Sequence, residues 1–496
     1  MFRNILAASA LTLLLGACAS PTTFWRPRPE PVGLPTNVVK LLNDAGIPAD
    51  AAGAIVIRVS DGATLLEHRS EASLQPASTL KLLTSIIGLE QLGPTYRGKA
   101  ELRTSGELAD GVLQGDLVLR GLGDPDLDWE ALQGMLQTLR HKGAAEISGD
   151  FVLDRQWFQP PRPDLGVPPF DETPEFRYNV IPDALTLNTN LLQLDLESGD
   201  QVKNKGMRAN MVPKLDRVAI VSNMTFIDRP CAKWEDGWVL PTVGRSENGD
   251  IRIELKGEYP KNCAASTSIS VLDRVDFADR LFRTLWRNLG GTFNGRTREG
   301  AAIDAAATGT RLLAQHQSRT LAEVTRDINK RSDNTITRML YLSLGALAKD
   351  DAETVTSLRA EKQVRAWLKR YGIADDGLVL DNGSGLSRIE RIRPAQLAQV
   401  LKVAHASAWS PEFMASLPIV AVDGGMQRRL RDSPAAGLAR IKTGTLRDVS
   451  AVAGFVPDAT NQRCIVVMMI NHPLAKSAVT HPILDALIDW VARSGK

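Results

Sequence analysis

The stretch Pro76-Ala77-Ser78-Thr79-Leu80-Lys81 opens an apolar segment that is predicted to be helical from Ser78 to Leu92. Residues i and i+3 of a helix share one face, so the Lys81 amine would reach the Ser78 hydroxyl. Ser78 would lie at the helix N-terminus, where free N–H groups favour a developing anion. A serine needs a base to become a nucleophile, and a lysine can be that base when burial or a nearby cation lowers its pKa. The stretch predicts a Ser–Lys nucleophile pair, although Ser-x-x-Lys alone is more often a helix cap beside a surface lysine.

A second short motif, Ser332-Asp333-Asn334, falls inside a segment with helical apolar periodicity from Thr320 to Leu344. Ser332 could relay a proton to a departing amine, and Asn334 could hold a substrate amide. A lone tripeptide of this kind is usually a capping or turn element. It indicates a catalytic site only in combination with the other motifs.

A third motif, Lys442-Thr443-Gly444-Thr445, lies in a strand pattern close to the C-terminus. Gly444 would let a substrate backbone approach the strand edge closely. Lys442 would lower the pKa of Lys81 and attract a substrate carboxylate. Alone, this motif is most simply a strand with a solvated lysine.

The two ends of the chain predict one shared sheet. A strand pair is expected at 54–59 and 63–67, with the turn signal Asp61-Gly62 between the strands. Helical periods follow the nucleophile segment and return after about residue 305. Three strands and a final helix are expected last, at 438–445, 449–456, 462–470 and 476–493. The outer segments therefore predict an α/β domain into which the middle of the chain is inserted.

The middle of the chain, from about 97 to 305, reads as many short strands with Gly, Pro and Asp turns. Two helix-turn-strand units recur at the same internal spacing, one around Thr138-Leu139 and the other around Thr284-Leu285. A β-rich stretch, about 191–264, separates them. A domain nested inside an inserted domain would produce this pattern, and chance similarity is the alternative.

Composition excludes several classes of protein. The chain has 496 residues, 43% of them hydrophobic and 23% charged, as in ordinary globular proteins. A net charge of +2 is too balanced for a nucleic-acid binder that relies on phosphate neutralisation. The six histidines lack metal-ligand spacing and no Cys-x-x-Cys occurs, so no metal site is expected.

The N-terminus predicts export and lipid anchoring. Arg3 precedes an apolar stretch, Ile5 to Leu15, which is about as long as a secretory h-region. Leu15-Gly16-Ala17-Cys18 then resembles the bacterial lipoprotein cleavage motif, which implies a lipid on the Cys18 thiol, and a plain signal peptide is the alternative. Ala19 after this cysteine favours the outer membrane by the sorting rule of some Gram-negative bacteria. The Pro-rich segment 18–35 would hold a periplasmic body off that membrane.

The remaining cysteines fall into two groups. Cys464 lies in an apolar strand pattern and is expected to be a buried thiol. Cys231 and Cys263 lie in polar, loop-like contexts of one segment, and in an oxidising periplasm they could pair. Two unpaired thiols are the alternative.

The three motifs together match, in order and context, those of penicillin-recognising serine enzymes. Ser78 and Ser332 are 254 residues apart, far more than in a class A β-lactamase, and Ser332 and Lys442 are 110 apart. The chain resembles the class C low-molecular-mass penicillin-binding proteins, the D-alanyl-D-alanine carboxypeptidase/endopeptidase family. Further matching stretches are Gly115-Asp116-Leu117 to Asp124-Pro125, Gly149 to Asp154 with Phe158, Asp381 to Arg388, and Ala453-Gly454-Phe455-Val456.

The resemblance covers essentially all of the chain after the Pro-rich segment. It implies an α/β (α+β) transpeptidase/β-lactamase-like domain with two inserted, β-rich domains. The lipid anchor departs from many relatives, and Arg447 stands where some carry Gln. The expected division is a signal peptide 1–17, a tether 18–35, a peptidase domain 36–96 and 306–496, an inserted domain 97–190 and 265–305, and a nested domain 191–264.

The resemblance also implies which residues bind substrate. Stem-peptide diaminopimelate carries a free amine and a carboxylate, so its site needs an anion and a cation. The resemblance implies Asp171 as the anion, with Glu172 next to it as the alternative, and Arg388 as the cation. Arg447 is a second cation that could grip the carboxylate with two hydrogen bonds. Surface charges without a role are the alternative for all of them.

The expected function is that of a periplasmic serine DD-peptidase that hydrolyses peptidoglycan stem peptides and is acylated covalently by β-lactams. Ser78 attacks, Lys81 accepts the proton, the N–H groups of Ser78 and Thr445 hold the oxyanion, and Ser332 with Lys442 protonates the departing amine. This serine-peptidase function implies no cofactor. Two other functions stay open: a β-lactamase, which would turn penicillin over, and a non-catalytic peptidoglycan-binding lipoprotein, which would not be acylated.

Overall fold

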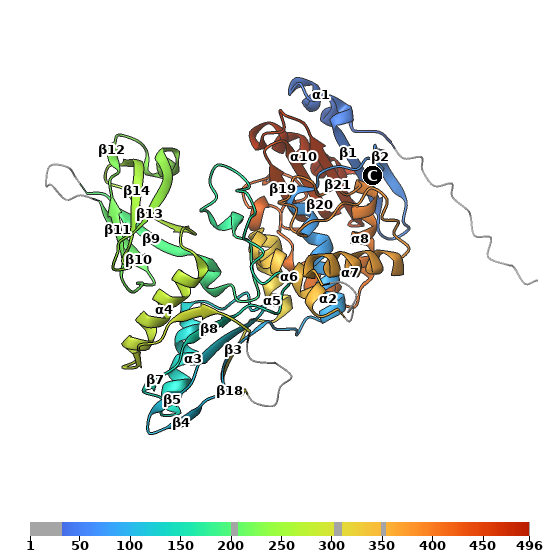
Figure 1. Ribbon diagram of the computed structural model, residues 1–496. Helices are drawn as coiled ribbons and strands as arrows, with labels where there is room; N and C mark the ends of the chain where they lie inside the picture. The colour runs from blue at the N-terminus through green and yellow to red at the C-terminus, as the bar shows by residue number, and fades with distance from the viewer. Residues whose placement is uncertain (1–31, 200–206, 302–309, 349–353, 496) are drawn as a thin grey trace, which may run out of the picture.

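A five-stranded antiparallel sheet joins the two ends of the chain, as expected. The computed structural model describes residues 32–199, 207–301, 310–348 and 354–495. Figure 1 shows the sheet on the right of the molecule, with strand order β19-β20-β21-β1-β2. The strands are β1 (Ala52–Arg58), β2 (Thr64–His68), β19 (Arg440–Leu446), β20 (Val449–Pro457) and β21 (Arg463–Asn471). Since β1 pairs with β21, residues more than four hundred positions apart in sequence form one core.

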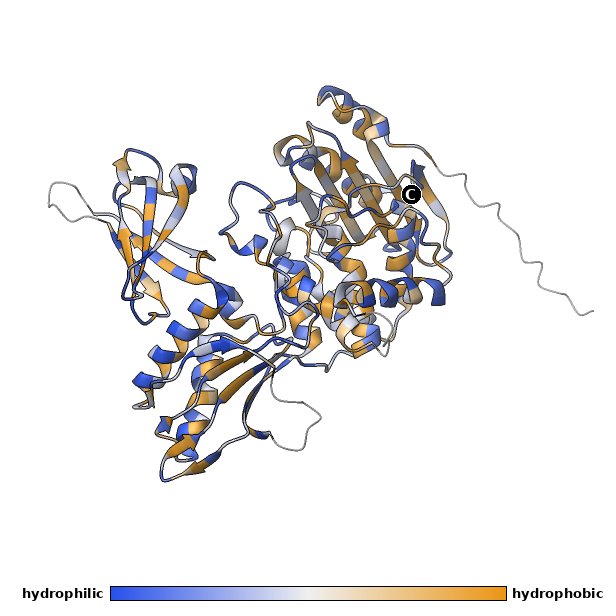
Figure 2. Ribbon diagram, in the orientation of Figure 1, coloured by the Kyte–Doolittle hydropathy of each residue, from blue (hydrophilic) through white to orange (hydrophobic). Residues whose placement is uncertain are grey.

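Both faces of this sheet are covered, which explains its nearly continuous apolar strands. Along β21, Ile465, Val467 and Met469 pack into the core on one face. Cys464, Val466 and Met468 pack on the other face, because successive strand residues point to opposite sides. The second face is covered by α1 (Thr36–Asp44) and α10 (Ser477–Arg493). Figure 2 shows hydrophobic residues along these strands.

A group of helices covers the first face and carries two of the three motifs. Ser78 lies in the short 3-10 helix η2 (Ala77–Leu80), which leads directly into α2. The helices are α2 (Lys81–Leu92), α5 (Leu321–Lys330), α6 (Asn334–Ala346), α7 (Thr356–Arg370), α8 (Pro394–Ala406) and α9 (Ser410–Ser416).

The single helix expected over 320–344 is wrong, because the structure divides it into α5 and α6. Ser332 has a left-handed φ of 58°, which ends α5. Asp333 then caps α6, since its Oδ1 accepts the backbone N–H of Ile336 at 2.9 Å. The second motif thus spans the break between two helices, and its last residue, Asn334, is the first residue of α6.

The inserted region begins with a five-stranded sheet, ordered β17-β8-β6-β3-β18, and a smaller one, ordered β16-β7-β5-β4. Helices α3 (Trp129–His141) and α4 (Arg274–Asn288) pack beside them. The strands are β3 (Lys99–Thr104), β4 (Glu107–Ala109), β5 (Val112–Gln114), β6 (Leu117–Leu122), β7 (Glu146–Ile147), β8 (Phe151–Asp154), β16 (Thr292–Phe293), β17 (Thr297–Glu299) and β18 (Arg311–Gln317).

The two helix-turn-strand units of the sequence lie side by side in this region. Strand β16 pairs in parallel with β7, and β17 pairs in parallel with β8. Helix α3 contacts α4. Each unit therefore completes the sheets of the other across the stretch of chain that separates them.

The structure moves two of the expected boundaries. Strand β18 pairs with β3 of the inserted sheet, so this sheet extends to Gln317 and not to 305. Its sequence places Leu312, Leu313 and Ala314 in succession rather than in alternation, and this hid the strand. Strand β15 (Ala264–Ile269) pairs with β9 (Leu192–Glu197), so the nested sheet extends past residue 264 to Ile269.

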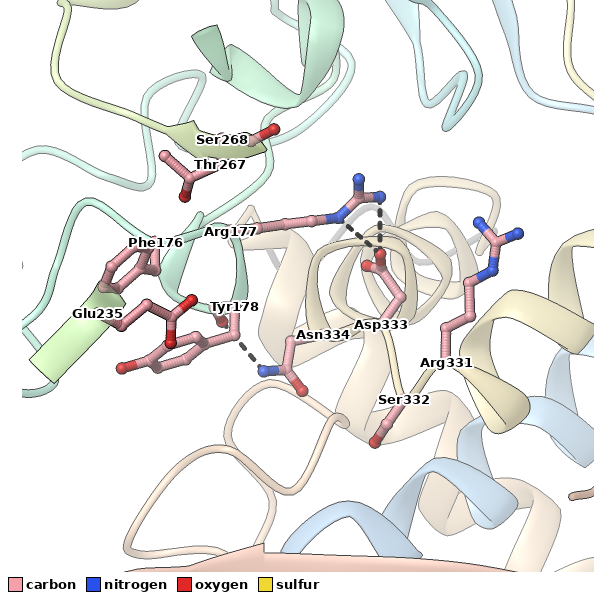
Figure 3. Close-up of a pocket in the computed structure, with 10 residues that line it drawn as sticks. All are labelled: Phe176, Arg177, Tyr178, Glu235, Thr267, Ser268, Arg331, Ser332, Asp333 and Asn334. Carbon is pink, nitrogen blue, oxygen red and sulfur yellow. Dashed lines mark hydrogen bonds and ion pairs between the residues drawn. The ribbon is translucent and has the colours of Figure 1, made fainter. Parts of the chain in front are cut away.

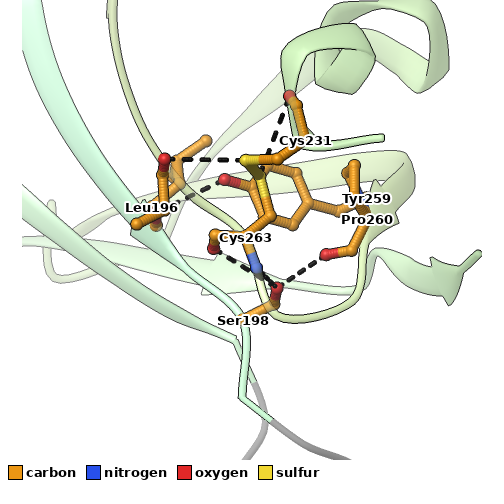
Figure 4. The surroundings of a disulfide bond; sticks show 7 residues. Leu196, Ser198, Cys231, Tyr259, Pro260 and Cys263 are labelled. Carbon is orange, nitrogen blue, oxygen red and sulfur yellow. Dashed lines mark hydrogen bonds between the residues drawn. A yellow bond between two sulfur atoms is a disulfide. The ribbon is translucent and has the colours of Figure 1, made fainter. Parts of the chain in front are cut away.

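The nested region holds two small sheets, ordered β10-β9-β15 and β11-β14-β12, with β13 added to β14. A disulfide joins Cys231 and Cys263, whose Cα atoms are 5.2 Å apart, and ties the 3-10 helix η6 (Cys231–Gly237) to β15. Figure 4 shows Ser198 beside this link, where its Oγ accepts the Cys263 N–H at 3.0 Å. The other strands are β10 (Arg208–Val212), β11 (Val218–Ser222), β12 (Thr225–Ile227), β13 (Trp238–Arg245) and β14 (Ile251–Pro260).

The remaining expectations concern the third cysteine and the N-terminal segment. Cys464 is a free, buried thiol on β21, and burial raises its pKa to about 12. The predicted signal peptide, Cys18 and most of the predicted tether lie outside the described residues. Within the described ranges, no helix is both long and apolar enough to cross a bilayer.

Candidate active site

Ser78 lies at a strained junction between the loop after β2 and helix α2. The preceding residue, Ala77, has a left-handed φ of 44°, which is unusual for a residue with a side chain. Such strain persists only where surrounding contacts impose it. Here Gly385 lies against the turn: a Cβ added to it would come within 1.8 Å of the Ala77 carbonyl oxygen. The turn that presents Ser78 is therefore built jointly by distant segments.

Lys81 is completely buried and has three oxygen partners. Its Nζ lies 2.8 Å from Ser78 Oγ, 2.7 Å from Asn334 Oδ1 and 2.6 Å from the carbonyl oxygen of Ser384. Burial lowers the pKa of Lys81 well below its ordinary value, and the nearby Lys442 cation lowers it further. Glu390 and Asp333 oppose this effect without reversing it.

These partners would leave the lone pair of a neutral Lys81 amine pointing at Ser78. A neutral amine has two N–H donors and one lone pair. The amide oxygen of Asn334 and the carbonyl of Ser384 can only accept, so they take the two N–H groups. The lone pair is left facing the Ser78 hydroxyl, which then donates to Lys81.

Lys442 makes a second buried Ser–Lys pair with Ser332. The Lys442 Nζ lies 2.8 Å from Ser332 Oγ and 2.8 Å from the carbonyl oxygen of Thr443. The side chain is 1% exposed, and burial lowers its pKa to about 7. Near neutral pH this lysine can therefore either hold or release a proton.

Two contacts from one segment of the inserted region hold the Ser332-Asp333-Asn334 break. The Asp333 carboxylate pairs with Arg177 at 2.9 Å, so the inserted region clamps the motif. The Asn334 Nδ2 donates to the carbonyl of Tyr178 at 3.0 Å. This second bond orients the Asn334 amide with its oxygen toward Lys81.

Gly444 lets β19 pass close to the nucleophile. A Cβ on this residue would lie 2.8 Å from the Ser78 nitrogen and 2.8 Å from the Pro76 carbonyl oxygen, both backbone atoms that cannot yield. Thr445, the next residue, lines the same cavity as Ser78. The Thr443 carbonyl holds Lys442, and the Thr443 side chain lies next to Gly425.

Glu390 is a residue of the site that the sequence did not reveal. It is 0% exposed, and its carboxylate accepts four backbone N–H groups of one loop. Oε1 accepts from Asp381, Asn382 and Gly383, and Oε2 accepts from Gly385. Burial raises the pKa of Glu390 although these bonds counteract the rise. Glu390 thereby shapes the loop whose Ser384 carbonyl contacts Lys81.

One cavity of about 420 Å³, the active-site cavity, collects the expected recognition residues beside Ser78. Asp171, Glu172, Arg388 and Arg447 all line it. Thr443 and Gly444 do not line it, although they lie next to residues that do.

The charged groups of this cavity already have partners. Burial raises the pKa of Asp171, but hydrogen bonds from Tyr178, Thr173 and Asn179 outweigh it and lower the pKa. Arg447 pairs with Glu172 at 3.0 Å. Arg388 stacks over the Phe170 ring at 4.8 Å. A zwitterionic ligand would therefore enter a site whose anion and cation are preoriented.

The described residues contain no cluster of His, Cys, Asp or Glu that could hold a metal ion.

Comparison with known proteins places this chain among the DD-peptidases. The family described as D-Ala-D-Ala carboxypeptidase 3 (S13) matches residues 34–494. The D-alanyl-D-alanine carboxypeptidase of Actinomadura sp. (strain R39) is 27% identical over 457 residues, which cover 88% of this chain and 80% of that protein. D-alanyl-D-alanine carboxypeptidase DacB of Haemophilus influenzae is 26% identical over 468 residues, 93% of each chain.

A solved structure has the same fold. Penicillin binding protein 4 (dacB) of Haemophilus influenzae superposes with a TM-score of 0.75 at 24% identity, covering 92% of this chain and 100% of that one. The resemblance carried by the three motifs is thus confirmed at the level of family and fold. The family match spans nearly all of the sequence, so the chain belongs to the D-Ala-D-Ala carboxypeptidase 3 (S13) family of serine-type DD-peptidases.

Proposed function

We propose that this protein is a serine D-alanyl-D-alanine carboxypeptidase and endopeptidase that hydrolyses peptidoglycan stem peptides through an acyl-enzyme. The observation that carries the proposal is the position of Lys81 Nζ, 2.8 Å from Ser78 Oγ, with both of its other partners able only to accept hydrogen bonds. A buried amine so placed is a base for Ser78.

Acylation begins when Ser78 Oγ attacks the carbonyl carbon of the D-Ala bond. The Ser78 proton passes to Lys81 Nζ, and the new C–O bond leaves a negative charge on the carbonyl oxygen. The backbone N–H groups of Ser78 and Thr445 stabilise this oxyanion in the scheme. The close passage of β19 at Gly444 supports the pairing of these two residues.

The second Ser–Lys pair completes the step. As the C–N bond breaks, the departing amine needs a proton. Ser332 delivers it from its hydroxyl and is replenished from Lys442, whose pKa near 7 suits a proton carrier at neutral pH. Water then hydrolyses the ester, which releases the acyl group as a carboxylate and restores Ser78.

The recognised acyl group contains diaminopimelate in this proposal. Its side-chain amine would lie beside Asp171 and its carboxylate beside Arg388, both of which line the active-site cavity. Arg447 is a weaker candidate, because Glu172 already pairs with it.

The site of action is the periplasm, with attachment to the outer membrane through a lipid on Cys18. The Leu15-Gly16-Ala17-Cys18 motif and the following Pro-rich segment support this. Cys18→Ser should release the protein from the membrane fraction and leave its activity in vitro unchanged.

Mass spectrometry after exposure to benzylpenicillin tests the proposed reaction. The wild-type protein should gain one long-lived penicilloyl group on Ser78, and Ser78→Ala should gain none while remaining folded by circular dichroism. Rapid release of hydrolysed penicillin would indicate a β-lactamase instead. Absence of any adduct on the folded wild-type protein would indicate a non-catalytic peptidoglycan-binding protein.

A further inference from the structure

A second cavity begins at the proton-relay side of the active-site cavity. It has a volume of about 590 Å³ and shares Tyr178, Ser332 and Asn334 with the active-site cavity, but it does not include Ser78. Figure 3 shows Ser332 and Asn334 on one side of it and Thr267 and Ser268 of the nested region on the other. The nested region supplies no residue to the chemistry of Ser78. It nevertheless forms one wall of a cavity that adjoins the active-site cavity.

The position of this cavity indicates which part of a substrate would enter it. In the proposed function, on which this inference rests, Ser78 faces the acyl part and Ser332 protonates the departing amine. A cavity that contains Ser332 without Ser78 therefore extends along the departing part of the substrate. A departing D-alanine, with its one-carbon side chain, would fill only a small share of a space large enough for a drug-sized ligand.

The far wall of this cavity is fixed by links within the nested region and by one link to the inserted domain around it. Glu235 lies on η6, which the Cys231–Cys263 disulfide ties to β15. Next to Glu235, the buried Trp234 packs edge-to-face with Trp238, with ring centroids 5.5 Å apart. The Trp238 Nε1 donates to the carboxylate of Glu175 at 2.9 Å. The wall is thus preformed rather than dependent on a ligand.

The chemistry of the lining suits an extended peptide with charges of both signs. Arg177 and Arg331 lie on the side of the cavity toward Ser332 and Asp333. Glu235 lies on the opposite side. Thr267 and Ser268 belong to β15, the end strand of its sheet in the described part of the chain. Only Ile269 at its end continues in a bridge, to Phe176. An end strand offers backbone N–H and C=O groups to which an extended peptide can add.

We propose that this second cavity binds the stem peptide of the departing strand when the enzyme cleaves a peptidoglycan cross-link. The bond between the D-Ala carbonyl and the diaminopimelate side-chain amine breaks as the Ser78 ester forms. Ser332 donates the proton to that amine, and the released stem peptide lies along β15. The nested region is then the element that favours cross-link cleavage over release of a terminal D-alanine.

The substitution Ser268→Trp in the full chain tests this by filling the cavity from β15, where an aromatic residue is well tolerated. We expect kcat/KM on a purified cross-linked muropeptide dimer to fall about tenfold or more, equivalent to about 1.4 kcal/mol. On a pentapeptide ending in D-Ala-D-Ala it should change less than about twofold, as should the rate of acylation by benzylpenicillin. Thr242→Trp, on exposed β13 of the same region and outside the cavity lining, is the matched control and should leave all three rates unchanged.

The outcomes separate the inference from the function on which it rests. Equal rates on the dimer in Ser268→Trp and wild type would overturn the inference, as would equal losses on dimer and pentapeptide. Competitive inhibition of dimer cleavage by peptide-free glycan strands, but not by a free stem peptide, would also overturn it in favour of a sugar. Failure of the proposed function would appear earlier, as a wild-type protein that cleaves neither peptide.

Discussion

The two buried Ser–Lys pairs differ in how the chain brings them together. Ser78 and Lys81 are three residues apart on one turn. Ser332 and Lys442 are 110 residues apart, on a helix break and on a strand. Yet both amines are almost wholly buried, both lie 2.8 Å from their serine, and both have a lowered pKa. Closeness in sequence is therefore not required for such a pair. The pair depends on burial of the amine and on acceptors that orient it.

The pairs also differ in what surrounds each amine. Lys81 has two acceptors besides its serine, whereas Lys442 has one, the Thr443 carbonyl. Two acceptors fix a neutral amine as a base, and one leaves freedom to carry a proton. The comparison predicts that Lys81 matters most for attack on the carbonyl and that Lys442 acts as its electrostatic neighbour and as a proton carrier.

The largest effect should come from Lys81→Met, which keeps the volume and removes the base. Acylation by benzylpenicillin should fall on the order of 10³-fold, because Ser78 then lacks a proton acceptor. The rate of penicilloyl adduct formation by mass spectrometry measures this. Lys369→Met, on the exposed end of α7, is the control, and an equal loss in both variants would contradict the assignment.

A smaller effect, on the order of 10²-fold, is expected for Lys442→Met. Its signature is a shift in the pH profile. Acylation needs neutral Lys81 and so falls as the pH drops through the Lys81 pKa. The Lys442 cation lowers that pKa. Removal of the Lys442 cation should raise the Lys81 pKa and move the acid limb of the rate profile to higher pH. An acid limb at the wild-type pH would contradict the proposed electrostatic coupling of the two pairs.

Substrate recognition should be separable from both pairs. Asp171→Ala and Arg388→Ala should each lower kcat/KM on diaminopimelate-containing peptides about tenfold, because a hydrogen bond to a charged group is lost. Acylation by benzylpenicillin, which lacks that zwitterion, should be nearly unchanged. Arg493→Ala, which removes only an exposed ion pair outside this cavity, is the control. Equal losses on peptide and penicillin would mean that these residues support the fold.

The smallest effect is expected for Glu390→Gln, which removes a charge next to Lys81 at constant volume. The Glu390 carboxylate raises the Lys81 pKa, so its loss should lower that pKa and move the acid limb to lower pH, opposite to Lys442→Met. The rate on that limb should then rise about threefold. Kinetics of adduct formation across pH decide the sign, and a shift in the same direction as Lys442→Met would refute the electrostatic account.

The sequence was sufficient wherever a feature is local or repeated. Ser78 and Lys81 follow from the spacing of helix residues. The shared sheet follows from apolar strands at both ends of the chain, and these include β1 and β21. The pairing of Cys231 with Cys263 was left open by the sequence, and the structure links them.

Features that depend on contacts between distant segments were missed. The Glu390 carboxylate accepts hydrogen bonds from four backbone N–H groups. Because every residue type except proline has such a group, no sequence pattern indicates these partners. The clamp of Arg177 on Asp333 joins the inserted region to the helices across 156 positions. The break at Ser332 was hidden because the apolar period continues through it from α5 to α6.

The burial of the lysines has a consequence for proton linkage. In the unfolded chain a lysine has a pKa of about 10.4, while that of Lys442 in the folded protein is about 7. The unfolded chain therefore binds more protons, and this difference costs about 4 kcal/mol of folding free energy at pH 7. The cost is fully present below pH 7 and fades as the pH rises toward the unfolded value. A screen for heat resistance alone would thus enrich variants that have lost these lysines, and with them the reaction.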